Sequence, residues 1–168
     1  MRIYLIGFMG AGKSFWGPRL AREAGFRFFD LDQVLEESQG ERIDTIFSQH
    51  GEEAFRQLEK DCLHLLTESH TQFVMACGGG TPCFLNNIEY MKQSGKVVWV
   101  NPAVETIAQR LTTARQQRPL LQSVTDEELL GYIQKKMADR RLYYEQADLR
   151  IDEEPIDLSA VLKSLLHA

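Results

Sequence analysis

The residues from Gly7 to Ser14 constrain the fold of this chain more than any other stretch. Their sequence, GFMGAGKS, fits the pattern GxxxxGK followed by Ser or Thr, and an apolar run at 3–6 precedes them directly. In such a loop, glycines let backbone N–H groups point at phosphates, the next helix directs its positive end toward them, and the lysine neutralises their charge. The glycine spacing does not fit the GxGxxG fingerprint of dinucleotide-binding proteins. A glycine-rich turn without a ligand is the alternative, which the flanking strand and helix patterns disfavour.

Length, charge and cysteine content narrow the class of protein. With 168 residues, the chain is expected to form one domain, residues 1–168, with a buried core. The net charge of −5 disfavours a nucleic-acid-binding surface, which needs a basic face. Cys62, Cys77 and Cys83 match no zinc-site spacing and predict ordinary thiols in a reducing compartment. No apolar run approaches the roughly 18 residues of a membrane span. We therefore expect a cytoplasmic monomer without membrane or nucleic-acid partners.

Short apolar runs alternate with amphipathic stretches along the chain. Predicted strands lie at 3–6, 26–29, 73–76, 96–100 and 149–151. The first predicted helix follows Ser14, runs to about Ala24 and stops at Gly25. Further helices are predicted as two short segments within 33–47, from Gly51 to 66, and in four stretches before the C-terminus. Asn101 and Pro102 predict a helix start, with Asn101 as the cap. The alternation predicts a three-layer α/β domain with a five-stranded parallel sheet, helices on both faces, and ligands at the carboxyl ends of its strands.

Polar or glycine-rich clusters follow the first three predicted strands. The phosphate loop follows the first strand, Asp30 and Asp32 follow the second, and Gly78 to Gly80 follow the third. Residues 10–15 would hold ATP, Ser14 and, through water, Asp30 would hold magnesium, and Asp32 could orient or deprotonate an acceptor hydroxyl. The alternative for the two aspartates is a pair of loop acids or helix caps.

Several arginines could neutralise the charge of a phosphoryl group or of an anionic acceptor. Residues 112–124 lack apolar periodicity and carry Arg118, which indicates a mobile lid that could close over the transferring group. Arg56 and either Arg140 or Arg141 could hold an acceptor carboxylate or phosphate in a planar fork, with Glu59 orienting Arg56. An exposed Arg and Glu three residues apart are equally often a solvated helix face.

These motifs together closely resemble shikimate kinase over nearly the whole chain. The matching stretches are GFMGAGKS at 7–14, DLD at 30–32, Ile46, Phe47, Gly51, Glu52, Phe55, Arg56 and Glu59, GGG at 78–80, RPLL at 118–121, and Arg140 with Tyr144. The resemblance implies ATP- and Mg²⁺-dependent phosphorylation of the 3-hydroxyl of shikimate on an adenylate-kinase-like fold, a step of chorismate and aromatic amino-acid synthesis.

The resemblance also implies roles for individual residues. Shikimate would be bound by Asp32, Arg56, Gly78, Gly79, Gly80 and Arg140, with the two arginines on its carboxylate and residues 33–66 forming the substrate-binding helices. ATP would be bound by Gly10, Ala11, Gly12, Lys13, Ser14, Phe15, Arg110 and Arg118. The catalytic residues would be Lys13, Asp32 and Arg118, and the metal would be held by Ser14 and Asp30.

The chain departs from the family pattern just after the phosphate loop. Two other hypotheses about its function also stay open. Phe15 and Trp16 replace small or β-branched residues, and Pro18 is unusual in that helix. Other small-molecule kinases, such as gluconate or nucleoside monophosphate kinases, share the loop and lid but not the combination of DLD, Phe55-Arg56 and triple glycine. A catalytically silent nucleotide-binding module would be expected to lack Lys13, Asp32 or Arg118.

Overall fold

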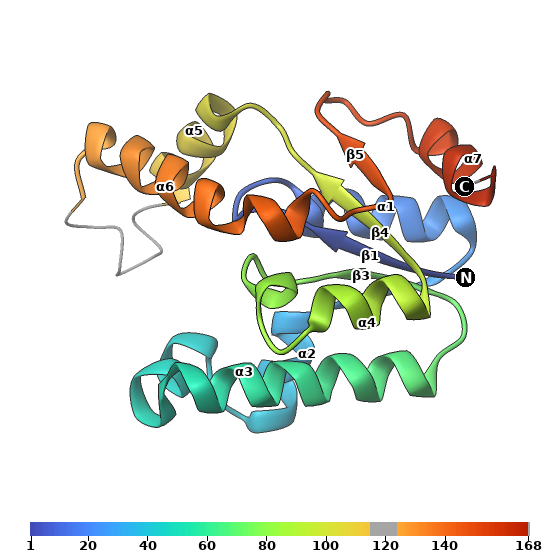
Figure 1. The fold of residues 1–168 in the computed structure, drawn as a ribbon, viewed down its shortest axis with the longest axis horizontal. Helices are drawn as coiled ribbons and strands as arrows, with labels where there is room; N and C mark the ends of the chain where they lie inside the picture. Colours follow the sequence, from blue (N-terminus) through green and yellow to red (C-terminus); the bar gives the residue numbers. More distant parts are fainter. Residues whose placement is uncertain (115–123, 168) are drawn as a thin grey trace.

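One parallel β-sheet organises the protein. The computed structural model describes residues 1–114 and 124–167. Five strands lie in the order β2-β3-β1-β4-β5, and every neighbouring pair is parallel. Their bounds are Arg2–Ile6 (β1), Arg27–Asp30 (β2), Phe73–Ala76 (β3), Lys96–Val100 (β4) and Leu149–Ile151 (β5). The predicted five-stranded parallel sheet is confirmed (Figure 1).

The helices agree with the predicted alternation. Their bounds are Lys13–Ala24 (α1), Leu31–Gln39 (α2), Ile43–Ser69 (α3), Asn87–Ser94 (α4), Val104–Ala114 (α5), Asp126–Tyr144 (α6) and Leu158–His167 (α7), with a 3₁₀ turn, η1, at Thr81–Cys83. Gly25 ends α1 with φ 70°, in the left-handed conformation that glycine adopts at little cost. Gly51, with φ 82° and ψ 170°, interrupts α3, so a new helical segment begins there as predicted.

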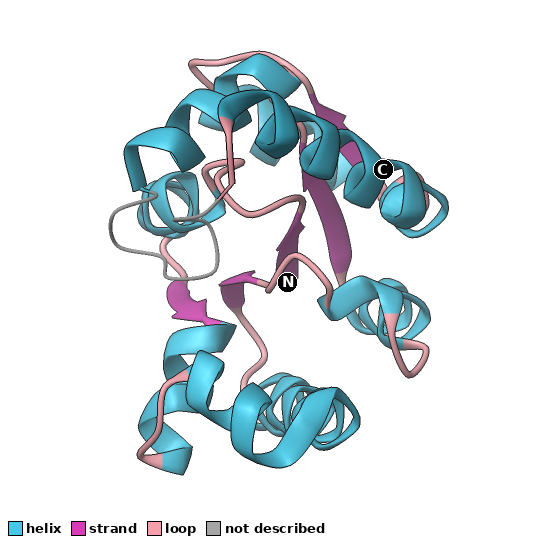
Figure 2. Cartoon of the chain, turned by 90° about the vertical axis from the view of Figure 1, so that its left-hand side faces the viewer, coloured by secondary structure: helices cyan, strands magenta, loops and turns pink. Residues whose placement is uncertain are grey.

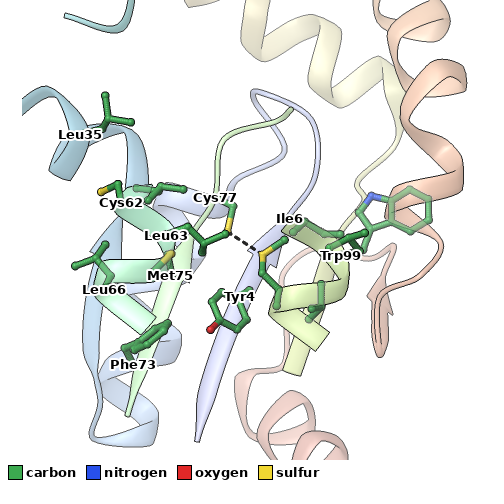
Figure 3. Close-up of a cluster of buried hydrophobic side chains, with 14 of the residues drawn as sticks. Tyr4, Ile6, Leu35, Cys62, Leu63, Leu66, Phe73, Met75, Cys77 and Trp99 are labelled. Atoms are coloured by element: carbon green, nitrogen blue, oxygen red, sulfur yellow. Dashed lines mark hydrogen bonds between the residues drawn. The ribbon is translucent and has the colours of Figure 1, made fainter. Parts of the chain in front are cut away.

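The sheet is buried on both faces, which explains why its central strands are apolar without interruption. Along β1, Ile3 and Leu5 pack with α1 and α7 side chains such as Leu20 and Val161, whereas Tyr4 and Ile6 face the opposite layer. That opposite layer joins the sheet to α2, α3, α4 and the end of α6; Figure 3 shows part of it. Cys77, at the end of β3, belongs to this core and lies 3.7 Å, sulfur to sulfur, from Met91.

Two pairs of helices stand on opposite sides of the edge where the strands end. α5 and α6 lie on one side and α2 and α3 on the other, as the view onto that edge in Figure 2 and the labels in Figure 1 together show. α5 and α6 share a small apolar cluster with Phe8 of the phosphate loop. A capping box formed by Thr125 and Glu128 begins α6. Among the helices of the described residues, none is both long and apolar enough to cross a membrane.

The two ends of α5 differ from the expectations drawn from the sequence. α5 begins at Val104, so Asn101 does not cap it; the Asn101 amide instead donates to Asp152 Oδ1 at 2.6 Å, next to β5. The predicted lid at 112–124 begins inside α5, which continues through Ala114. Residues 115–123, which include Arg118, lie outside the described part of the chain.

Candidate active site

The phosphate loop joins β1 to α1 and forms one wall of a cleft of about 590 Å³. Gly7 has φ +143°, and a Cβ there would lie 2.4 Å from the Val100 carbonyl oxygen, so only glycine fits against β4. Gly12 has φ +102° and immediately precedes α1, which begins at Lys13. Gly10, Gly12, Lys13, Ser14 and Phe15 line the cleft, while Ala11 is fully buried beneath the loop. The N-terminus of α1 therefore opens onto the cleft, as a phosphate site requires.

Lys13 is almost completely buried at the base of this cleft. Its Nζ donates to the carbonyl oxygens of Gly7 at 2.6 Å and Phe8 at 2.9 Å. Burial lowers the pKa of Lys13 to about 8, although the nearby Cys77, Asp32 and Asp30 act in the opposite direction. A bound phosphate would add negative charge beside the ammonium group and favour its protonated form.

Asp30 and Ser14 place oxygen donors side by side at the mouth of the cleft. The Ser14 hydroxyl donates to Asp30 Oδ2 at 2.7 Å. The other oxygen, Oδ1, accepts from the backbone N–H of Gln33 at 3.3 Å and caps α2. Asp30 is therefore a helix cap, as the alternative held, and lines the cleft as well. Hydroxyl and carboxylate oxygens are the donor set that Mg²⁺ takes beside phosphates and water.

Asp32 lies in the first turn of α2 and lines the same cleft. Burial raises the pKa of this carboxyl group to about 6; the negative charges of Glu59 and Asp30 add to the shift, and Lys13 opposes it. A carboxylate with a pKa near 6 accepts a proton more readily than an ordinary aspartate and is still ionised at neutral pH.

The triple glycine connects the cleft to both predicted acceptor arginines. A Cβ on Gly78 would lie 3.2 Å from both Asp32 Oδ1 and Glu59 Oε2. A Cβ on Gly79 would lie 2.9 Å from Arg140 Nη1, and a Cβ on Gly80 only 2.5 Å from Arg56 Nη2. Gly79 also approaches the phosphate loop, since its Cβ position lies 3.5 Å from the Met9 nitrogen. Three consecutive residues without side chains thus let the acid, both arginines and the phosphate loop converge.

Arg56 is only 9% exposed, and several contacts hold its side chain in place. Its Nη1 donates to Glu59 Oε1 at 2.9 Å, and Glu59 Oε2 accepts from the Thr81 hydroxyl at 2.7 Å. The guanidinium carbon lies 4.1 Å from the centre of the Phe84 ring. The prediction that Glu59 orients Arg56 is consistent with these contacts, and the solvated-face alternative is wrong because Glu59 is 1% exposed.

Arg140 and Arg141 have different surroundings. The Arg140 guanidinium lies 5.4 Å from the Phe8 ring centre and next to Gly79. Arg141 points to the exterior and pairs with Glu145, one turn further along α6. Tyr144 donates from its hydroxyl to the Gly79 carbonyl oxygen at 2.6 Å, which ties the end of α6 to the triple glycine. Of the two arginines, only Arg140 is close to the other candidate residues.

Arg110, which the family resemblance places at the ATP site, lines the cleft and donates to the Gly10 carbonyl oxygen at 3.1 Å. Its ion pair with Glu154 was not anticipated from sequence motifs. Glu154 and Thr81 carried no recognisable sequence signal because their partners are distant in the chain. For Phe84, the only hint was its position shortly after the triple glycine.

Comparisons with known proteins agree with this geometry. The model of a family described as shikimate kinase matches residues 9–168. The shikimate kinase of Parabacteroides distasonis is 37% identical, over 98% of this chain and 99% of that protein. A shikimate kinase of Bacteroides fragilis is 43% identical, over 88% and 82% respectively. The crystal structure of the Bacteroides thetaiotaomicron shikimate kinase superposes with a TM-score of 0.91 at 36% identity, covering 100% of this chain and 99% of that one. The Acinetobacter baumannii shikimate kinase, solved in complex with shikimate, superposes with a TM-score of 0.84 at 35% identity, covering 99% and 90%.

Proposed function

Because this chain belongs to the shikimate kinase family, we propose that its cleft transfers the γ-phosphate of ATP to the 3-hydroxyl group of shikimate. The protein is an ATP-dependent small-molecule kinase with an alcohol acceptor, and its reaction belongs to chorismate and aromatic amino-acid synthesis. The single observation that supports this function best is the close approach of other groups to Gly78, Gly79 and Gly80. At these three glycines the phosphate loop, a carboxylate and two arginines lie close together.

The proposed proton acceptor is Asp32. It shares the cleft with Lys13, its pKa is about 6, and Gly78 leaves room beside its Oδ1. An acceptor hydroxyl bound there would be oriented toward the phosphate loop and could pass its proton to the carboxylate as the new O–P bond forms. The Lys13 ammonium group would stabilise the negative charge of the transferring phosphoryl group.

The proposed metal ligands are Ser14 and, through water, Asp30. Their oxygens lie 2.7 Å apart at the N-terminus of α1, and this donor set suits Mg²⁺, which binds few protein oxygens and keeps several waters. Bound Mg²⁺ would neutralise charge on the ATP phosphates. Because Asp30 also caps α2, the same carboxylate fixes the first turn from which Asp32 projects.

The proposed carboxylate-binding groups are Arg56 and Arg140, which approach neighbouring glycines of the triple glycine. Guanidinium groups bind carboxylates in a planar, often bidentate geometry, so a shikimate carboxylate suits this pair better than an uncharged sugar. A gluconate carboxylate would also satisfy them, and the two acceptors must therefore be compared directly. AMP has no carboxylate.

Further parts of the proposal rest on the resemblance and on composition. We propose that the chain works as one kinase domain in which 33–66 hold the acceptor and 112–124 form a lid whose Arg118 contacts ATP phosphates. Phe15 and Arg110, which line the cleft, are also proposed to contact ATP. A cytoplasmic monomer without nucleic-acid or membrane partners is also proposed; the negative net charge disfavours nucleic acid as a partner, and the three free cysteines fit a reducing compartment.

A coupled ADP-release assay tests the function. We expect faster turnover with shikimate and Mg-ATP than with gluconate, and less than about 1% of the shikimate rate with AMP, because AMP lacks the carboxylate that the two arginines are proposed to bind. Preferred turnover of gluconate or AMP would overturn the choice of acceptor. ATP binding without transfer to any small alcohol would favour the silent nucleotide-binding module.

A further inference from the structure

Glu154 joins two helices that are far apart in the sequence: α1, which follows the phosphate loop, and α5. Its Oε1 accepts from the indole Nε1 of Trp16 at 3.0 Å, and its Oε2 accepts from Nη2 of Arg110. Trp16 lies in the first turns of α1, Arg110 lies on α5, and Glu154 lies between β5 and α7. One carboxylate therefore fixes two side chains that both line the cleft.

The three side chains converge on the backbone of the phosphate loop. A Cβ on Gly12 would lie 3.1 Å from Trp16 Cδ1, 3.3 Å from Glu154 Oε1 and 3.4 Å from Arg110 Nη1. Arg110 also donates to the Gly10 carbonyl oxygen at 3.1 Å. The guanidinium group therefore lies next to Gly10 and Gly12, two of the loop residues that are expected to bind phosphates.

Arg110 needs such a partner to keep one position. Its side chain is 40% exposed, and a long exposed arginine loses considerable rotamer entropy when a ligand fixes it. The Glu154 side chain is half as exposed, at 20%, and its second oxygen is tied to the indole. A guanidinium group that is already fixed before nucleotide arrives binds with a smaller loss of entropy.

We propose that Glu154 is a positioning residue for the nucleotide: it holds Arg110, and through Trp16 the first turns of α1, in the arrangement that binds ATP. This inference rests on the proposed function only in taking a nucleotide as the ligand of the cleft. Glu154 itself need not touch ATP, and it acts on nucleotide affinity rather than on the transfer step.

Calorimetric titration with Mg-ADP tests the role of Glu154 without an acceptor. Glu154→Gln keeps an oxygen for the Trp16 indole but loses the charge that holds Arg110, and it should weaken Mg-ADP binding about fivefold, the size expected for one partly exposed ion pair. Arg110→Gln should weaken binding at least as much. Because Glu154 acts through Arg110, the double variant should bind no more weakly than Arg110→Gln alone.

Kinetics and two further variants complete the test. Glu154→Gln should raise the KM for ATP with kcat and the KM for shikimate unchanged, a pattern that a general loss of stability would not produce. Trp16→Phe, which keeps a ring but loses the indole N–H, should weaken Mg-ADP binding about twofold. Glu145→Gln is the matched control, since Glu145 also pairs with an arginine, Arg141, but lies outside the cleft.

Two results would overturn the role of Glu154. One is wild-type Mg-ADP affinity in Glu154→Gln, and the other is a double variant in which the two losses multiply. Failure of the proposed function would look different, because the wild-type chain would then bind Mg-ADP but not phosphorylate shikimate.

Discussion

The two ends of the cleft are built in different ways. The proposed nucleotide end includes one continuous stretch, Gly7 to Ser14, whose backbone N–H groups and helix terminus would supply binding groups. The proposed acceptor end would depend on side chains from α2, α3 and α6, which come close to one another where Gly78 to Gly80 leave room for them. A phosphate site can therefore be recognised from a short sequence pattern, whereas a site for a small organic acid depends on the tertiary fold.

Asp32 lies where the two ends meet, and its replacement should have the largest effect. Asp32→Asn keeps the shape of the side chain but cannot accept a proton, so kcat should fall about 10²–10⁴-fold, the usual contribution of general base catalysis. Mg-ADP affinity should change less than about twofold, which calorimetry can measure. Asp44→Asn, on the exposed part of α3, is the control. Unchanged kcat in Asp32→Asn would remove Asp32 from the mechanism.

Arg56 belongs only to the acceptor end, so its replacement separates the two ends. Arg56→Lys keeps a positive charge beside the buried Glu59 but loses the planar fork. We expect the KM for shikimate to rise roughly 30-fold, about 2 kcal/mol, while the KM for ATP stays within about twofold. Arg42→Lys, at an exposed ion pair with Asp44, should change neither constant. A change confined to the KM for ATP would contradict the assignment of Arg56 to the acceptor.

Arg140 and Arg141 are neighbours in sequence with opposite surroundings, which makes them a matched pair. Arg140→Gln should raise the KM for shikimate about tenfold, since one charge-assisted hydrogen bond is lost. Arg141→Gln should leave it unchanged, because Arg141 pairs with Glu145 away from the cleft. Steady-state kinetics with shikimate as the varied substrate decide between them. Equal effects of the two variants, or a larger effect of Arg141→Gln, would contradict the assignment of Arg140 to the acceptor.

The pH dependence of activity and of stability should have opposite signs. Burial raises the pKa of Asp32 from 3.8 to about 6. The ionised base is lost as the pH falls through 6, so kcat/KM should drop about tenfold from pH 7 to pH 5.

The folded state holds the proton more tightly than the unfolded chain, so this group favours folding below pH 4 and loses that contribution as the pH rises through 6. At pH 7.5, Asp32→Asn should therefore have a free energy of unfolding higher than that of wild type by about 1–3 kcal/mol at most. Its melting temperature should be a few degrees higher. An acid limb near pH 4 in the rate profile would contradict the raised pKa.

The phosphate loop could be recognised from one local pattern, whereas the residues proposed for the acceptor kept alternatives until the family resemblance implied their roles. Strands such as Phe73–Ala76 and the phosphate loop have local signatures, because a short apolar run predicts a buried strand and the spacing of glycine and lysine predicts the loop. The burial of Arg56 could not be deduced, since Thr81 and Phe84 contact it or its partner only after β3 and α3 have packed. Asn101 shows the same limit: a good helix-cap residue bonds instead to Asp152, which lies 51 positions later.

Tyr144 tests how far the acceptor end depends on one tertiary hydrogen bond. Its ring is fully buried and packs against Trp99, with 5.6 Å between ring centres, so Tyr144→Phe should keep the packing and lose only the bond to the Gly79 carbonyl oxygen. Removing one buried hydrogen bond costs about 1 kcal/mol, and if that cost falls on the arrangement of the triple glycine, the KM for shikimate should rise about three- to fivefold. The KM for ATP should stay constant, because the lost hydrogen bond joins Tyr144 to the Gly79 carbonyl oxygen and includes no atom of the phosphate loop. Tyr143→Phe changes the adjacent, more exposed tyrosine and should have no effect on either constant. Should the loss appear only as a lower melting temperature, the bond would stabilise α6 without positioning the acceptor, and the triple glycine would keep its arrangement through Asp32, Arg56 and Arg140 alone.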